Sequence, residues 1–164
     1  MASQFQHSVS YPFSADRYWE LISGEQYWRD LLEATNSSHG RLESFRADGD
    51  TVAVELRQGV PEDRLPAAVT TVRPGDLEIP RSMVFTHAAG TVTGTITASV
   101  SGAPAKVDGT LRVSGDPATT VYKGTATVAI PFVGGKIESA VVEQLVELLD
   151  NECAKTVNWE TDNR

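Results

Sequence analysis

The hydrophobic residues between positions 134 and 160 recur with a period near 3.6, which predicts one long C-terminal helix. Two polar residues, Glu152 and Thr156, fall within its apolar arc. Because charged side chains are rarely buried, we first expect that the helix has left the core there and that Glu152 reaches solvent; the alternative is a polar group at a buried site. The stripe expected to face the sheet comprises Ile137, Val141, Leu145 and Leu148.

The pattern at the start of the chain is that of a strand followed by two short helices. Residues 4–11 alternate between apolar and polar positions, with Phe5, His7 and Val9 on one face, so we expect a half-buried strand. Ser14 is placed to cap the first helix. The similar segments RYWELI and QYWRDL give each helix an aromatic face, and we expect both to cover one end of the sheet.

Strand patterns separated by turn signals occupy most of the region from residue 39 to residue 130. An Asp-Gly-Asp turn at 48–50 predicts a hairpin joining 41–47 to 51–58, with Val54 and Leu56 on its inner face. Residues 59–66 predict a polar loop. The further predicted strands are 67–73, 83–87, 91–100, 107–114 and 119–130, the last four forming an antiparallel meander.

Three of these strands share a short phrase, VTGTITA, VDGTLRV and YKGTATV, which places Gly94, Gly109 and Gly124 at equal intervals. Each glycine is in phase with apolar neighbours, so all three are expected to face the helix. Folding about the predicted turns would bring them into a row across the sheet. We hypothesise that this row lets the sheet bend and leaves space on its concave face; three separate bulges are the alternative.

No predicted element other than the C-terminal helix is large enough to cover the strands. We therefore expect an α+β architecture, a curved antiparallel sheet around one helix, as one domain over residues 1–164. The net charge of −8, without a Lys/Arg cluster, argues against nucleic acid as a partner. The chain has no bilayer-length apolar run and no signal-peptide pattern, so we expect a cytoplasmic protein without integral membrane association. The lone Cys153 is expected to be an inert thiol.

The order of strand, two short helices, antiparallel meander and long helix resembles the helix-grip fold of the START and polyketide-cyclase-like (SRPBCC) superfamily. The segments SVSYPFSADRYWELIS, VSGAPAKVDGTLRV and VAIPFVGGKIESAVVEQL resemble more closely an uncharacterised bacterial family of unknown function within it, and IPFVGGKIE is the most specific part. The resemblance implies a hydrophobic ligand held between the sheet and the C-terminal helix. It implies no catalytic residues, because the superfamily has no common set.

Motifs for several other chemistries are absent. The VGGK phrase lacks the rest of a phosphate-binding loop, so we interpret it as a hinge into the helix. His7, His39 and His87 have no metal-ligand spacing, so we expect neither a metal site nor a cofactor. No GxSxG nucleophile motif is present.

The candidate polar group inside an apolar cavity consists of His7, Tyr122 and Glu152. Two of these side chains within reach of one ligand position could act as general acid and base, as in a cyclase or dehydratase. They could equally orient a ligand by hydrogen bonds alone. His7 is also readily explained as an ordinary half-buried strand residue, which we favour.

The preferred hypothesis is binding of a lipid-like or polycyclic small molecule, with a cofactor-free enzyme as the alternative. A protein-interaction module of the chaperone-cofactor type would instead show a filled core and an exposed apolar patch. The cavity is open only if Trp19, Trp28 and Phe132 do not fill it. Catalytic residues and oligomeric state are left open. The predicted ligand-binding residues are His7, Val54, Leu56, Ile96, Leu111, Tyr122, Ile137, Val141, Leu145, Leu148 and Glu152.

Overall fold

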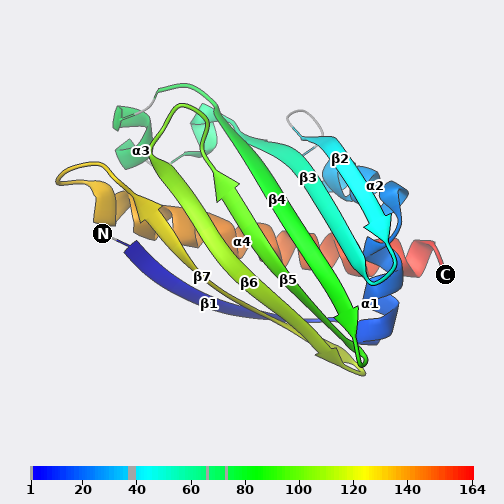
Figure 1. Ribbon diagram of the computed structural model, residues 1–164. Helices are drawn as coiled ribbons and strands as arrows, with labels where there is room; N and C mark the ends of the chain where they lie inside the picture. Colours follow the sequence, from blue (N-terminus) through cyan, green and yellow to red (C-terminus); the bar gives the residue numbers. More distant parts are fainter. Residues whose placement is uncertain (1, 37–39, 66, 73) are drawn as a thin grey trace.

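In a computed structural model of the protein, which describes residues 2–36, 40–65, 67–72 and 74–164, one antiparallel sheet is crossed by a long helix (Figure 1). The sheet has seven strands in the described part of the chain, in the order β1-β7-β6-β5-β4-β3-β2. The elements are β1 (Ala2–Ser10), α1 (Ala15–Ile22), α2 (Glu25–Asn36), β2 (Arg41–Asp48), β3 (Thr51–Val60), η1 (Glu62–Arg64), α3 (Ala67–Val72), β4 (Leu77–Ala88), β5 (Thr91–Ser99), β6 (Ala105–Gly115), β7 (Ala118–Val128) and α4 (Gly134–Asp162).

This arrangement confirms the predicted α+β architecture with two short helices after the first strand. The hairpin between β2 and β3 turns at Gly49, whose positive φ of 61° suits glycine. Ser14 caps α1 as expected, since its Oγ accepts a hydrogen bond from the backbone N–H of Arg17 at 3.0 Å. Short-range signals therefore determine these turns and caps.

Helix α4 begins at Gly134, as predicted, and continues to Asp162. It packs mainly against β1, β7 and α2. Near its start, the carboxylate of Glu138 is inaccessible to solvent and accepts hydrogen bonds from the backbone N–H of Val128 and from Ser3 Oγ, each at 2.9 Å. The N–H of Val128 lowers the pKa of Glu138, so this side chain links the helix as an anion to the ends of β1 and β7.

The predicted strand over 67–73 is wrong, because residues 67–72 form helix α3. The β-branched residues of this segment favour strands, but propensity is a weak prior. In the helix the hydroxyl of Thr71 donates a hydrogen bond to the backbone carbonyl of Ala67 at 2.8 Å, so a local side chain supplies a donor for this carbonyl.

Strand β4 begins at Leu77, six residues before the predicted start at Met83. Pro80 lies within the part of the strand that the sequence pattern did not predict. In the sheet, Pro80 pairs with Arg57 of β3, but the pairing of β4 with β5 begins only at Arg81. Pro80 thus lies where one side of β4 is an edge, and its missing N–H breaks no ladder there.

The three glycines face the inner side of the sheet, but Gly94 and Gly124 do not leave it open, and of the three only Gly109 lies on the wall of the cavity between the sheet and α4. Gly109 lies directly opposite Gly124, whereas Gly94 lies opposite Leu111 and is offset from that pair. A Cβ atom at Gly124 would be 2.7 Å from the ring of Phe5, and one at Gly94 would be 3.0 Å from the ring of Phe85. The expected free space above the row is therefore wrong for these two positions, because aromatic rings lie directly on the glycine backbone.

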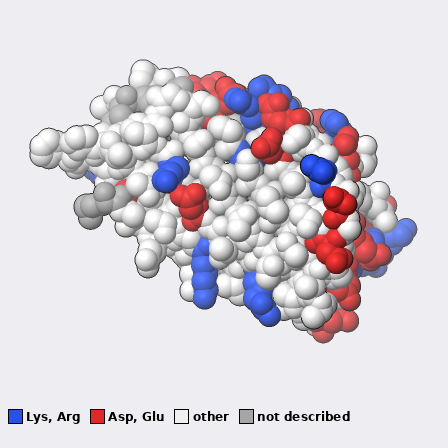
Figure 2. Space-filling view, viewed as in Figure 1, with Lys and Arg blue, Asp and Glu red and all other residues white. Residues whose placement is uncertain are grey.

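The packed core gathers toward the end of the sheet that α1 and α2 cover (Figure 1). Ile22, Val54, Phe85 and Leu149 are each 2% exposed or less and belong to it. The opposite end of the molecule, where α3 and the start of α4 lie, carries few charged side chains in the view of Figure 2. None of the helices described is both long and apolar enough to cross a membrane.

Candidate functional site

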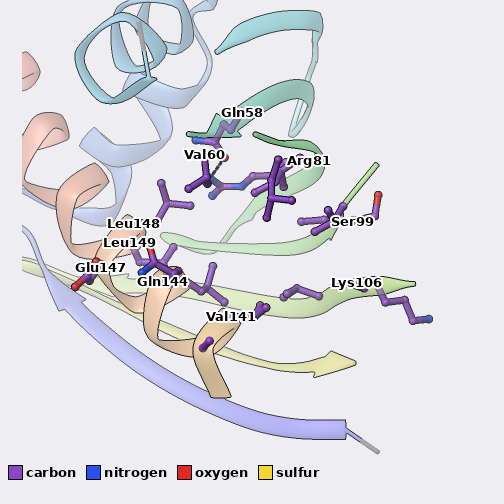
Figure 3. A pocket seen from close by; sticks show the side chains of 18 of the residues that line it. Gln58, Val60, Arg81, Ser99, Lys106, Val141, Gln144, Glu147, Leu148 and Leu149 are labelled. Atoms are coloured by element: carbon purple, nitrogen blue, oxygen red, sulfur yellow. Dashed lines mark hydrogen bonds between the residues drawn. The ribbon is translucent and has the colours of Figure 1, made fainter. Parts of the chain in front are cut away.

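A cavity of about 510 Å³ lies between the inner face of the sheet and α4 (Figure 3). Residues of β3 to β7 line it on one side, and the first half of α4 lines it on the other. The segment around η1 and the turn between β5 and β6 also contribute. Its surface is mainly apolar, with Val60, Leu65, Leu77, Ile79, Ile96 and Val107 as examples.

The four helix positions predicted to face the sheet all lie on the cavity wall. Ile137 is buried, whereas Val141, Leu145 and Leu148 are only half-buried. These three leucine and valine side chains point toward the sheet without being fully covered by it, as expected beside unfilled space. Their contact with a ligand stays a prediction.

An ion pair joins the sheet to α4 at this cavity. The guanidinium of Arg81, on the cavity wall, donates from Nη1 to Oε2 of Glu152 at 2.7 Å and from Nη2 to Oε1 at 3.2 Å. The two side chains are only 7% and 12% exposed. Gln58 completes the cluster: its Nε2 donates to Glu152 Oε2 at 3.3 Å, and its Oε1 accepts from Arg81 Nη1 at 3.4 Å. Strands β3 and β4 are thereby tied to the helix.

Electrostatics keep Arg81 protonated and the nearby tyrosines neutral. Burial opposes the charge of Arg81, but the carboxylate of Glu152 outweighs burial, so the pKa of Arg81 is raised. Burial raises the pKa of Tyr122, which lines the cavity, and that of Tyr27. The hydroxyl of Tyr27 is 2.7 Å from that of Thr156. The cavity wall therefore includes a neutral tyrosine and a charged guanidinium.

The expectation that Glu152 reaches solvent is wrong. Its side chain lies inside, bonded to Arg81 and Gln58, and Thr156 one turn later is also buried, at 1% exposure. Charged side chains are rarely buried unless they have a partner of opposite charge, and Glu152 has such a partner in Arg81. The alternative interpretation, a polar group at a buried helix position, describes the protein.

Arg81 and Gln58 were not predicted as site residues, although the sequence carries a signal for both. Gln58 continues the inner-face alternation of Val54 and Leu56, and Arg81 is in phase with Met83. A polar residue at an apolar position of a strand is a candidate for a buried polar site. Because the predicted strand began at Met83, Arg81 was not assigned to a strand face.

The described histidines do not line the cavity. Nε2 of His7 is 2.6 Å from a carboxylate oxygen of Asp150. His87 stacks on Trp19 with ring centroids 5.1 Å apart, and its Nε2 is 2.9 Å from Oδ1 of Asp16. His39 lies outside the described residues. Of His7, Tyr122 and Glu152, only Tyr122 contributes directly to the wall.

The other predicted residues divide between the wall and the core. Ile96 lies on the cavity wall, whereas Val54, Leu56 and Leu111 are buried in the packed core beyond it. The three aromatic residues that could have filled the cavity do not line it. Trp28 is in the core, Trp19 packs against the core, and Phe132 is wholly exposed. The cavity is therefore unfilled by the side chains considered for that role.

Solved structures with the same architecture cover nearly the whole chain at low sequence identity. The Zhui aromatase/cyclase from Streptomyces sp. R1128 is 11% identical, with a TM-score of 0.59 over 98% of this chain and 94% of its own. Ara h 8.0201 is 9% identical, with a TM-score of 0.56 over 99% of each chain. Protein Ms6760 from Mycobacterium smegmatis is 8% identical, with a TM-score of 0.56 over 98% and 92%. The chain therefore shares the helix-grip α+β fold of these structures.

Sequence comparison gives the narrower relationship. The uncharacterized protein Rv0481c of Mycobacterium tuberculosis is 31% identical over 173 aligned positions, which cover 99% of each chain. The uncharacterized protein Mb0491c of Mycobacterium bovis matches to the same extent. The pattern of one family matches residues 6–159. The chain therefore belongs to the family described as protein of unknown function (DUF2505).

Proposed function

We propose that this protein binds a hydrophobic small molecule, lipid-like or polycyclic, in the cavity between the sheet and α4. The observation that carries the proposal is the cavity, whose volume of about 510 Å³ falls within the range of about 300–1,000 Å³ typical of small-molecule sites. Its mainly apolar lining with a few buried polar groups is also typical of such sites. Unfilled apolar space costs stability, so an occupant is a physical reason for its presence.

The placement of the candidate acid–base residues favours binding over catalysis. The enzyme hypothesis needs two of His7, Tyr122 and Glu152 at one ligand position. Tyr122 lines the cavity, but Glu152 is held by Arg81, and His7 is beside Asp150. The likeness to an aromatase/cyclase is one of fold, which is consistent with a cavity here and transfers no reaction.

Native mass spectrometry of the purified protein, followed by solvent extraction, tests whether a hydrophobic molecule copurifies. Titration with the neutral fluorophore N-phenyl-1-naphthylamine tests binding directly. Ala140→Phe places a ring into the cavity wall and should weaken binding of the fluorophore by about tenfold or more, which is about 1.4 kcal/mol.

Glu143→Phe is the matched control, because Glu143 is exposed on the same helix and does not line the cavity. It should leave fluorophore binding unchanged. Equal loss in both variants, or no saturable binding by the parent protein, would refute the proposal.

A further inference from the structure

Arg81 is the buried charged side chain on the wall of the proposed binding cavity. Lys106 and Glu147 also contribute to the wall, but both are exposed and extend away from the other labelled side chains in Figure 3. Arg81 instead extends toward Gln58 and is 7% exposed. A ligand that enters the cavity therefore meets this guanidinium away from bulk water, where a hydrogen bond is stronger than at the surface.

The guanidinium has donors that its protein partners leave unused. It carries five N–H groups in a fixed plane. Glu152 accepts from Nη1 and Nη2, and Gln58 accepts from Nη1. Within the described parts of the chain no residue accepts from Nε, and Nη2 has a second N–H beyond the one given to Glu152. These remaining donors fit an oxygen atom of a ligand.

The charge of Arg81 is already balanced. Glu152 does not line the cavity, but its carboxylate is bonded to both terminal nitrogens of the guanidinium. A ligand carboxylate would bring a second negative charge close to Glu152 in a site with little water, and no further buried cation is described on this wall. An uncharged carbonyl oxygen could accept the free N–H groups without adding any charge.

We propose that the cavity selects hydrophobic ligands with an uncharged oxygen acceptor, such as a ketone or ester carbonyl, over ligands with a carboxylate. Arg81 donates to that oxygen, and Glu152 is the counter-charge that disfavours acids. This selectivity rests on the proposed function, since it concerns the ligand of the same cavity. It narrows the ligand from any hydrophobic molecule to one with a neutral polar anchor.

Three probes of one chain length test the selectivity: decan-2-one, decane and decanoic acid, each displacing N-phenyl-1-naphthylamine near neutral pH, where the acid is ionised. The ketone should bind about tenfold more tightly than either of the others, as expected for one hydrogen bond to a charged donor. Acid binding as tight as ketone binding, or a ketone no better than the alkane, would overturn the inference and leave the proposed function intact. Failure of the fluorophore itself to bind would remove both.

Variants separate the anchor from general hydrophobicity. Glu152→Gln removes the counter-charge and should shift the preference toward the acid by about tenfold or more. Because removing one partner of a buried pair can unfold a protein, the double variant Arg81→Met/Glu152→Leu is the second arm. It should still bind decane but lose the ketone advantage. Arg112→Met is the control, because Arg112 is an exposed cation on the outer face of β6. It should change neither the binding of decane nor the preference for the ketone. A ketone preference that survives the double variant would contradict the role of Arg81.

Discussion

Replacing Glu152 by glutamine should test how much the ion pair contributes to stability. The substitution keeps the side-chain shape but leaves the guanidinium of Arg81, 7% exposed, without its counter-charge. At a charge separation of about 4 Å and an effective dielectric constant of about 20, the lost attraction is about 4 kcal/mol. This agrees with the cost of about 3–5 kcal/mol for removing one partner of a buried pair. We take about 3 kcal/mol, because glutamine retains part of the hydrogen bonding.

Thermal and urea unfolding followed by circular dichroism measure this change. For a chain of this size, about 3 kcal/mol corresponds to a Tm lowered by about 6–12 °C. The double variant Arg81→Met/Glu152→Leu should recover most of the loss, because neither charge remains buried. The control is Glu25→Gln, which breaks the exposed pair with Arg29 and should cost less than about 0.5 kcal/mol. A single variant as stable as the parent protein, or a double variant as unstable as the single one, would refute this reasoning.

Three further predictions concern other parts of the fold. Four buried tyrosines have pKa values raised mainly by burial. Above about pH 10 the unfolded chain loses these protons while the folded protein keeps them. The free energy of unfolding should therefore be unaffected by these groups below about pH 10 and fall above it by about 1.4 kcal/mol per pH unit for each tyrosine. The four are Tyr11, Tyr18, Tyr27 and Tyr122. Urea titrations across this pH range measure the slope, and tyrosinate absorbance appearing before unfolding would contradict the prediction. Gly124→Ala should destabilise by about 1–3 kcal/mol in urea unfolding, because its Cβ would lie 2.5 Å from the backbone oxygen of Asp108 and 2.7 Å from the ring of Phe5. Gly135→Ala, whose Cβ meets nothing within 4 Å, should stabilise the helix instead, and the opposite order would count against the close approach. Glu138→Ala should speed hydrogen exchange of the Val128 amide measured by NMR, whereas unchanged exchange would show that the bond does not protect it.

The elements of this protein were largely predictable because their signals are local. The period of the C-terminal helix, the Asp-Gly turn after β2 and the cap at Ser14 each depend on a few neighbouring residues. Alternation also assigned Val54 and Leu111 correctly to the inner face of the sheet. Alternation gives the face of a strand, but it does not say which part of that face another element covers. Here α1 and α2 cover one end, so these two residues are packed while Ile96 borders the cavity.

The central polar cluster could not be predicted as a whole, because its members come from distant segments. Glu152 is 71 residues from Arg81 and 94 from Gln58. A helical pattern identifies Glu152 as a polar residue within an apolar arc, but it contains no information about a partner in a distant strand. Burial of that carboxylate depends entirely on the partner, so the helix alone gave the wrong answer. Extending β4 back through Pro80 would have supplied the missing arginine.

The position of β1 beside β7 has a consequence for the order in which the chain can fold during synthesis. From β2 to β7, consecutive strands pair with one another, so these pairings can form as the strands leave the ribosome. Strand β1 emerges first but pairs with the last strand to be made, with Ala2 opposite Thr127. Before β7 is synthesised, β1 has no strand to pair with. If β1 were absent, the edge of β7 that faces it would stay unpaired in the folded sheet. We therefore expect that deleting residues 2–10 would leave a folded meander with an open, aggregation-prone edge, and that α4 would lose the hydrogen bond from Ser3 to Glu138 near its start.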